Sequence, residues 1–227
     1  MSRVIATFLL LGGWIAVQPA HSAVITGNIA AHSVNGGALV GYLDLTAGQD
    51  RYLLSALASA NIFDLDTSAS SPFSLLDQDA PASHRFFAGL ISPGIELLTT
   101  NSNAAILGDS PVTTSPGSTP QSGGSVSIPG AEYESAIWSR SGSDLSLRWV
   151  NHDGSSPATT TVWDPVGQTL YLTANPAAVI LNHPGSQAVN LVFTGTIPTD
   201  AVPEPSSFAL FSVALGGILF RQAKKAA

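Results

Sequence analysis

The clearest alternation of hydrophobic and polar positions lies in the second half of the chain. In SDLSLRWV, the residues Leu145, Leu147 and Trp149 alternate with polar residues, which is the period of a half-buried β-strand. The runs TTTVW (159–163) and QTLYLTA (168–174) are rich in strand-forming residues, and DPVG between them is a turn signal with proline in its second position. This pattern predicts antiparallel strands joined by tight turns.

Shorter apolar runs extend the pattern towards both ends. We interpret AAVILN (177–182) and AVNLVFTGTI (188–197), separated by HPGS, as two more strands. In the first half, similar signals cover the segments 23–33, 36–48, 71–78 and 86–100. Residues 50–60 fit a strand or one face of a helix, because their leucines suit both spacings.

Short β-rich runs with Gly, Pro and Asn between them predict an all-β fold, an antiparallel β-sandwich of jelly-roll or immunoglobulin-like type. Residues 110–125 are almost all Ser, Thr, Pro and Gly and cannot pack a core. They divide the body into a first β-rich lobe, 23–109, and a second one, 126–200. The same segment also fits a long loop between two strands of one sandwich, so one lobe and two lobes both remain open.

The first residues have the three-part layout of a secretory signal peptide. Arg3 supplies the positive start, an apolar stretch follows, and the small-residue pattern AHS ends it. We expect residues 1–22 to be removed by cleavage between Ser22 and Ala23. A retained anchor is the alternative, but the apolar stretch is shorter than the roughly 20 residues that a spanning helix needs.

Without its two ends the chain is strongly acidic. Residues 23–202 hold four arginines, no lysine and fourteen acidic residues, a net charge of −10. This balance excludes a nucleic-acid-binding surface, and it repels acidic polysaccharide unless a cation bridges the two. The chain has no cysteine, so disulfides, thiol nucleophiles and thiolate metal sites are excluded.

Motifs that would indicate catalysis are absent from the sequence. It has no G-x-S-x-G elbow and no H-E-x-x-H, and the histidines of the body are scattered. Glu132 and Glu134 would share one face of a strand, and a glycosidase needs two facing carboxylates, but two acids on one strand face are more often solvated. We therefore expect no catalytic residue and a body that is not an enzyme. A secreted hydrolase is the least supported alternative.

Two aspartate pairs are the candidate metal ligands. Asp64 and Asp66, and likewise Asp77 and Asp79, can each offer several carboxylate oxygens to Ca²⁺, which takes oxygen ligands. Neither pair matches the EF-hand loop, and acids that only contact solvent are the alternative. Calcium is the one cofactor that the sequence suggests.

Trp138 and Trp163 are candidate ligand contacts. An aromatic ring offers a flat apolar platform on which a sugar can lie, whereas in a sandwich the same residues are more often part of the core. Trp149 alternates with leucines, so we expect it in the core. The tryptophans suggest an alternative function for the body, a carbohydrate-binding module with or without calcium.

The C-terminal tail, residues 202–227, combines three features. Pro203 and Pro205 hold the backbone extended on either side of Glu204. Residues 208–220 form an uncharged apolar run that predicts a transmembrane helix, short for a bilayer, and a basic cluster after it should remain cytoplasmic. That cluster consists of Arg221, Lys224 and Lys225. A plain C-terminal anchor without processing is the alternative.

These three features, in this order, closely resemble the PEP-CTERM sorting tail. The sorting motif comprises Val202, Pro203, Glu204, Pro205 and Ser206. The resemblance implies a Gram-negative exopolysaccharide producer in which an exosortase, a membrane transpeptidase, recognises the tail and cuts near the motif. It also implies a transient stay in the inner membrane, and then transfer of the body to the outer envelope or the extracellular matrix, where exopolysaccharide is a partner. Gln222 and Ala223 depart from the family by interrupting the basic cluster.

A second resemblance concerns the body. FSLLDQDA (73–80) followed by LISPGIELL (90–98) is similar to the order of strand, acidic turn, strand and Pro-Gly in pre-peptidase-type β-sandwich modules. Those are accessory modules of secreted bacterial proteins, and the chain departs from them at Ile95, where they usually carry an aromatic residue. Tail and body together predict an exported, non-catalytic protein of the envelope or matrix.

Overall fold

The computed structural model describes residues 24–45, 51–66, 71–83, 85–123, 128 and 130–195. The predicted signal peptide and its cleavage point lie outside these residues, as do the sorting motif, the apolar run and the basic cluster of the tail. Among the described residues, no helix is both long enough and apolar enough to span a membrane.

Strands are the main regular structure of the described chain. Those before the segment 110–125 are β1 (Val24–Gly27), β2 (Ile29–Ser33), β3 (Leu39–Leu45), β4 (Tyr52–Ser55), β5 (Phe63–Asp66), β6 (Leu75–Asp77), β7 (Phe86–Ile91) and β8 (Ala104–Ser110). Those that follow are β9 (Gln121–Ser122), β10 (Glu132–Glu134), β11 (Trp138–Ser141), β12 (Asp144–Leu147), β13 (Thr160–Asp164), β14 (Thr169–Thr173) and β15 (Gln187–Phe193). A 3₁₀ turn, η1 (Leu57–Ser59), and one helix, α1 (Pro176–Asn182), complete the described elements.

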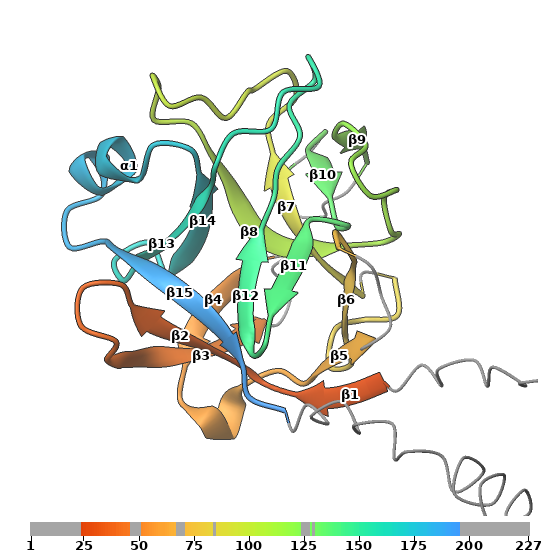
Figure 1. The fold of residues 1–227 in the computed structure, drawn as a ribbon, viewed down its shortest axis with the longest axis vertical. Coiled ribbons are helices and arrows are strands. Elements are labelled where there is room, and N and C mark those ends of the chain that lie inside the picture. The colour runs from red at the N-terminus through yellow and green to blue at the C-terminus, as the bar shows by residue number, and fades with distance from the viewer. Residues whose placement is uncertain are drawn as a thin grey trace, which may run out of the picture.

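These strands form one antiparallel sheet that curls on itself, so the prediction of an all-β antiparallel fold is confirmed. The main path of the sheet is β1-β5-β6-β7-β8-β14-β13-β15-β2-β3-β4. β10 extends β7, with β9 beyond it, and the β11–β12 hairpin joins β15. An isolated β-bridge joins Arg51, just before β4, to Gly108 of β8, so the last strand of this order lies against a strand in its middle. Figure 1 shows this curl, with β15 (blue) crossing between β2 and β12.

The core lies inside the curl and includes strands from both sides of the segment 110–125. The ring centroid of Phe87 lies 4.2 Å from that of Tyr52 and 4.4 Å from that of Trp138. All three side chains are buried and come from β4, β7 and β11. Burial of a large apolar side chain stabilises a fold by about 1.5–3 kcal/mol, so this aromatic centre holds three distant segments together.

The described part of the segment 110–125 packs against the body. Thr114 is buried, and its hydroxyl accepts hydrogen bonds from the backbone N–H groups of Ser135 and Ala136, each at 3.1 Å. The Thr114 N–H donates in return to the Ser135 hydroxyl at 2.8 Å. The strands on either side also pair directly, because β8 lies next to β14. These contacts attach the described part of the segment to the body.

One segment that the sequence predicts as a strand is a helix. Residues 177–182 lie in α1 and are not extended. The side-chain oxygen of Asn175 caps this helix by accepting a hydrogen bond from the Ala178 N–H at 3.2 Å. Pro176 lies in the first turn, where a missing N–H costs no helical hydrogen bond. The cap and the proline together outweigh the strand preference of the β-branched residues.

The turn predicted at DPVG agrees with the structure, whereas one strand is shorter than its pattern. Residues 165–168 form the turn between β13 and β14. The turn 151–154 is closed by a hydrogen bond from the Gly154 N–H to the Asn151 carbonyl oxygen at 2.9 Å, and Gly154 has a φ of +81°. The strand expected to continue to Trp149 ends at Leu147, yet Trp149 is still buried.

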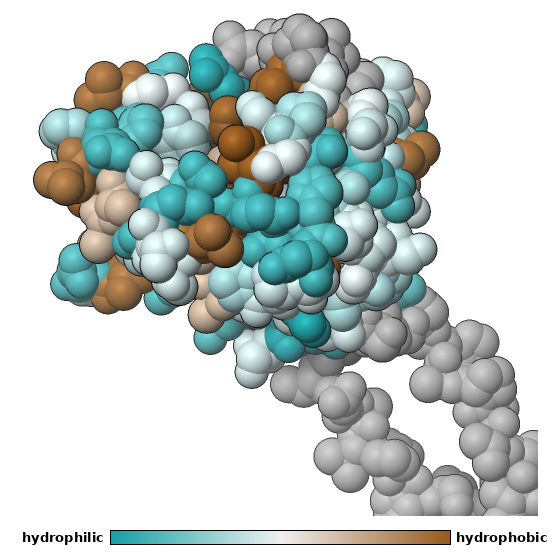
Figure 2. Space-filling model, turned by 90° about the horizontal axis from the view of Figure 1, so that it is seen from above, coloured by the Kyte–Doolittle hydropathy of each residue, from teal (hydrophilic) through white to brown (hydrophobic). Residues whose placement is uncertain are grey.

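Hydrophobic residues on the surface are dispersed. On the face seen in Figure 2, they form separate spots among hydrophilic residues. Two of the most exposed large ones are Val166, at the tip of the β13–β14 turn, and Leu181 on α1, which are 82% and 80% exposed. Single exposed hydrophobic residues are normal in folded proteins, so we attach no binding role to them.

Candidate functional site

A fork in the sheet beside β15 creates the candidate binding site. β2 pairs along one edge of β15, so β12 and β13 share the other edge. Leu145 of β12 pairs with Leu191. Thr161 of β13 pairs with Val189. Continued by one residue, either strand would place its next residue opposite Asn190, and the two strands therefore diverge there.

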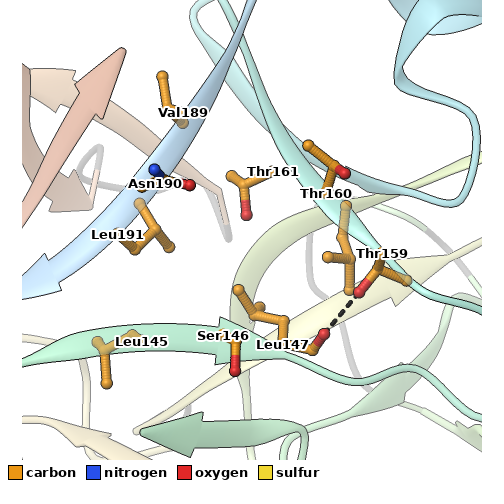
Figure 3. Close-up of a pocket in the computed structure, with 10 residues that line it drawn as sticks. Leu145, Ser146, Leu147, Thr159, Thr160, Thr161, Val189, Asn190 and Leu191 are labelled. Atoms are coloured by element: carbon orange, nitrogen blue, oxygen red, sulfur yellow. Dashed lines mark hydrogen bonds between the residues drawn. The ribbon is translucent and has the colours of Figure 1, made fainter. Parts of the chain in front are cut away.

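A pocket of about 120 Å³ opens where the two strands diverge (Figure 3). Its aliphatic side chains are Leu145, Leu147, Leu172, Val189 and Leu191. Its hydroxyl and amide side chains are Ser146, Thr159, Thr160, Thr161 and Asn190. The Thr159 hydroxyl donates to the Leu147 carbonyl oxygen at 2.5 Å and ties the diverging strands together, as the dashed line in Figure 3 shows. None of the described residues that line the pocket carries a charge.

Thr161 provides the free polar group of this pocket. Its side chain is 5% exposed, and Figure 3 shows its hydroxyl pointing into the space between β12 and β15. Within the described ranges, no residue makes a hydrogen bond to this hydroxyl. Asn190 is exposed and carries its amide at the same opening. The pocket can therefore offer a donor and an acceptor beside an aliphatic surface.

A second cluster joins the loop after β7, strand β10 and the turn 151–154. His152 Nδ1 lies 2.9 Å from Glu96 Oε1, and His152 Nε2 lies 2.9 Å from Glu132 Oε2. Both Glu96 oxygens also accept the His152 backbone N–H, each at 3.1 Å, and the Gly94 N–H donates to Glu132 Oε2 at 3.2 Å. Because both ring nitrogens contact carboxylates, neither is open to a substrate, and we assign the cluster a structural role.

Glu134 differs from its neighbour Glu132. Its side chain is 2% exposed, and both carboxyl oxygens lie 3.2–3.3 Å from the Val150 N–H, which donates to them. Burial raises the pKa of Glu134 to about 8, although this hydrogen bond opposes the rise. The expectation of two solvated acids is thus wrong for Glu134, because the segment after β12 covers it. A protonated carboxyl so deeply buried cannot reach a substrate.

A third polar contact links the β13–β14 turn to the end of α1. His183 Nδ1 lies 2.9 Å from Asp164 Oδ2, while Asp164 Oδ1 accepts from the N–H groups of Val166 and Gly167, each at 3.0 Å. Burial alone would raise the pKa of Asp164, but hydrogen bonds from Gly167, Val166 and His183 hold it below its ordinary value. The ring centroid of Tyr171 lies 5.0 Å from that of His183. In the part of the chain that the structure describes, no serine hydroxyl bonds to His183, so the pair resembles a structural contact more than a nucleophile's base.

Asp77, one of the calcium candidates, has protein partners on both oxygens. Its Oδ2 accepts the Tyr52 hydroxyl at 2.5 Å and the Asn61 amide at 2.6 Å. Its Oδ1 accepts the backbone N–H groups of Asp79 and Ala80 at 2.9 and 3.2 Å. Burial raises the pKa of Asp77, and these hydrogen bonds oppose the rise. The Asp77 carboxyl therefore links β4 to the residues just before β5 and just after β6.

The other calcium candidates face different groups. Asp79 Oδ2 accepts the Ile62 N–H at 2.7 Å, and Asp64 Oδ1 accepts the Thr26 hydroxyl at 2.9 Å. Asp66 ends β5, opposite Val24 of β1. Among the described residues, no group of three or more histidines and acids is arranged to hold a metal ion. The calcium site remains a prediction from the sequence.

Both candidate tryptophans lie in the core. Trp138 is fully buried, and its indole N–H donates to the Phe87 carbonyl oxygen at 3.0 Å. Trp163, on β13, is 7% exposed. Neither ring therefore presents a flat face to solvent on which a sugar can lie.

The pocket residues were not singled out by the sequence. The hydroxyl-rich run 159–161, which leads into the buried strand β13 and forms its first two residues, is their only local signal. Their meeting depends on the register of β12, β13 and β15, which periodicity along one segment does not give.

Compared with protein-family models, with curated proteins and with solved structures, the chain matches none.

Proposed function

We propose that this chain is an exported cell-envelope or extracellular-matrix protein of a Gram-negative exopolysaccharide producer, that an exosortase processes it, and that its body is not catalytic. The observation that carries the proposal is the order of features in residues 202–227. A Pro-Glu-Pro motif, a short uncharged run and a basic cluster follow one another there. In this proposal residues 208–220 anchor the chain in the inner membrane until cleavage near the motif frees the body.

The composition of the body supports export. It is acidic, free of lysine and cysteine, and rich in uncharged polar residues. Among the described residues, the hydrophobic core runs from Ile25 to Phe193 and so spans almost the whole described body.

We further propose that the curled antiparallel sheet is a β-sandwich, in which parts of the sheet face each other across the core. The aromatic contacts support this, since Phe63 of β5 and Phe87 of β7 pack against Tyr52 of β4, with ring centroids 5.7 and 4.2 Å away. The sandwich of pre-peptidase-type modules is the family arrangement that the sequence resembles, and the immunoglobulin-like and jelly-roll forms are its alternatives.

The sorting step is tested with Glu204→Ala in the full chain, expressed in a host that contains an exosortase. We expect the variant to stay at full length in the membrane fraction, because the extended motif that the enzyme recognises has lost its only charge. Asp200→Ala is the matched control, since it removes an acid four residues away and outside the motif. Cleavage of Glu204→Ala at the rate of the unchanged chain would refute recognition of the motif, and an unchanged chain that is not cleaved at all would mean that the tail is a plain anchor.

A second candidate function, carbohydrate binding by the body, is favoured by the pocket beside β15. An uncharged opening with hydroxyl, amide and aliphatic groups suits a neutral sugar, whose surface alternates hydroxyls and C–H groups. The high negative charge of the body would disfavour acidic polysaccharide unless calcium bridges the two. Binding of the full chain to an array of neutral and acidic glycans, with and without Ca²⁺, tests this candidate.

A further inference from the structure

We propose that the pocket beside β15 binds the acetamido group of a neutral N-acetylated amino sugar, with the sugar ring outside. This inference rests on the second candidate function, carbohydrate binding, and names the group that the site recognises. It is independent of the sorting tail, because it concerns only the region where β12, β13 and β15 meet.

The first argument is charge. None of the described lining residues is ionised, and the aliphatic floor offers no counter-ion. A carboxylate, sulfate or ammonium group in this space would lose hydration without gaining a partner, which is strongly unfavourable. The group that enters is therefore neutral.

The second argument is size. The pocket measures about 120 Å³, whereas an apolar cavity of about 150 Å³ accommodates a benzene ring. The space is therefore smaller than a cavity known to hold one six-membered ring, which favours a small substituent over a whole sugar residue. Ser146 and Asn190 are exposed at the opening, so the ring to which the substituent is attached stays outside, beside them.

The third argument is the pattern of polar and apolar groups. Thr161, 5% exposed, carries a hydroxyl that needs a hydrogen-bond partner inside the pocket, while Leu145, 7% exposed, and the half-buried Leu147 need an apolar one. A sugar hydroxyl would satisfy the first and leave the leucines in contact with water. The methyl group of a deoxy sugar would do the reverse. An acetamido group supplies a methyl group for the leucines, a carbonyl oxygen for Thr161 and an N–H for Asn190.

The experiment uses the full chain in a zwitterionic detergent that has no sugar head group. Saturation-transfer NMR and titration compare three oligosaccharides, the trimers of N-acetylglucosamine, of glucosamine and of glucose. We expect saturable binding of the N-acetylated trimer alone, with the strongest transfer to its acetyl methyl protons. Thr161→Val keeps the shape of the side chain and removes the hydroxyl, so we expect binding to weaken about three- to tenfold. Thr113→Val, at an exposed threonine outside the pocket, is the matched control.

A second variant tests the position of the site without altering buried residues. Ser146→Trp places a large side chain at the opening and should abolish binding, whereas Ser141→Trp on neighbouring β11, also exposed, should not. Equal binding of the glucose trimer would overturn the acetamido assignment and leave carbohydrate binding standing. Binding that survives Ser146→Trp or Thr161→Val unchanged would overturn the pocket as its site. Absence of binding by all three trimers would overturn both the acetamido assignment and carbohydrate binding by the body. The sorting proposal would be left to its own test.

Discussion

The buried carboxyl of Glu134 should make the stability of this protein fall as the pH rises, and Glu134→Gln should remove this contribution. The glutamine has the same shape and can still accept the Val150 N–H, but it cannot ionise. In the folded protein burial raises the pKa of Glu134 to about 8, from an ordinary value of 4.5. Between pH 4.5 and about pH 8, the Glu134 carboxyl therefore keeps its proton in the folded protein, whereas the unfolded chain has already lost it.

The sign and size of the effect follow from proton linkage. Unfolding releases the proton of Glu134 throughout this range, so the contribution is complete below about pH 4.5 and is lost as the pH rises towards 8. One pH unit corresponds to about 1.36 kcal/mol. Over the interval between the two pKa values, the free energy of unfolding should thus fall by about 5 kcal/mol, an order-of-magnitude figure for a side chain that is 2% exposed.

Urea unfolding followed by tryptophan fluorescence at pH 5, 6.5 and 8.5 measures this slope. We expect Glu134→Gln to match the unchanged protein at pH 5 and to exceed its stability by several kcal/mol at pH 8.5. Glu132→Gln, two residues away on the same strand, is the control and should leave the slope in place. A slope that Glu134→Gln leaves undiminished, or that is absent from the unchanged protein, would refute the reasoning.

Two further predictions concern packing and the β13–β14 turn. Gly89→Ala should lower the free energy of unfolding by about 1–3 kcal/mol, because a Cβ there would lie 2.8 Å from Trp149 Cζ3 in the core; Gly36→Ala, with no atom within 4 Å, should change it little. Asp164→Ala should cost about 1–3 kcal/mol at neutral pH, since it removes the acceptor of two backbone N–H groups. The pKa of Asp164 is lowered in the folded state, so its contribution is present above pH 3.8 and is lost as the pH falls through the lower folded value. Thermal melts between pH 2 and 7 should therefore converge for the unchanged protein and Asp164→Ala at the acidic end, and a constant difference would contradict this assignment.

Local sequence patterns are reliable predictors where a segment carries its own signal. The DPVG turn and the alternation of Leu145 and Leu147 correctly predict a turn and a strand. The helix α1 also had a local signal, Asn175 followed by Pro176, but the β-branched residues after it suggested a strand. In such a short element, the strand preference of β-branched residues competes with the stabilisation of a helix by its cap. Here the Asn175 cap prevails, and the segment is helical.

Features that depend on contacts between distant segments could not be predicted in this way. Glu132 and Glu134 lie on one strand, as their spacing indicates, yet only the position of Val150 explains why Glu134 is buried and Glu132 is not. The pocket requires Leu145, Thr161 and Leu191 to meet through strand register. Register is set by the packing of the whole sheet, and no single segment of the sequence contains it.

The pairing of β15 has a consequence for when this protein can fold. β15 is the last described strand, and it pairs with β2, β12 and β13. Just beyond it, the Thr194 hydroxyl bonds to the carbonyl oxygen of Asn28, 166 residues away. Contacts between such distant residues form slowly, because a large loop must close first. A chain emerging from its N-terminus would thus lack the strand that joins β2, β12 and β13 until nearly the whole body had emerged, so the sheet could not close before that point.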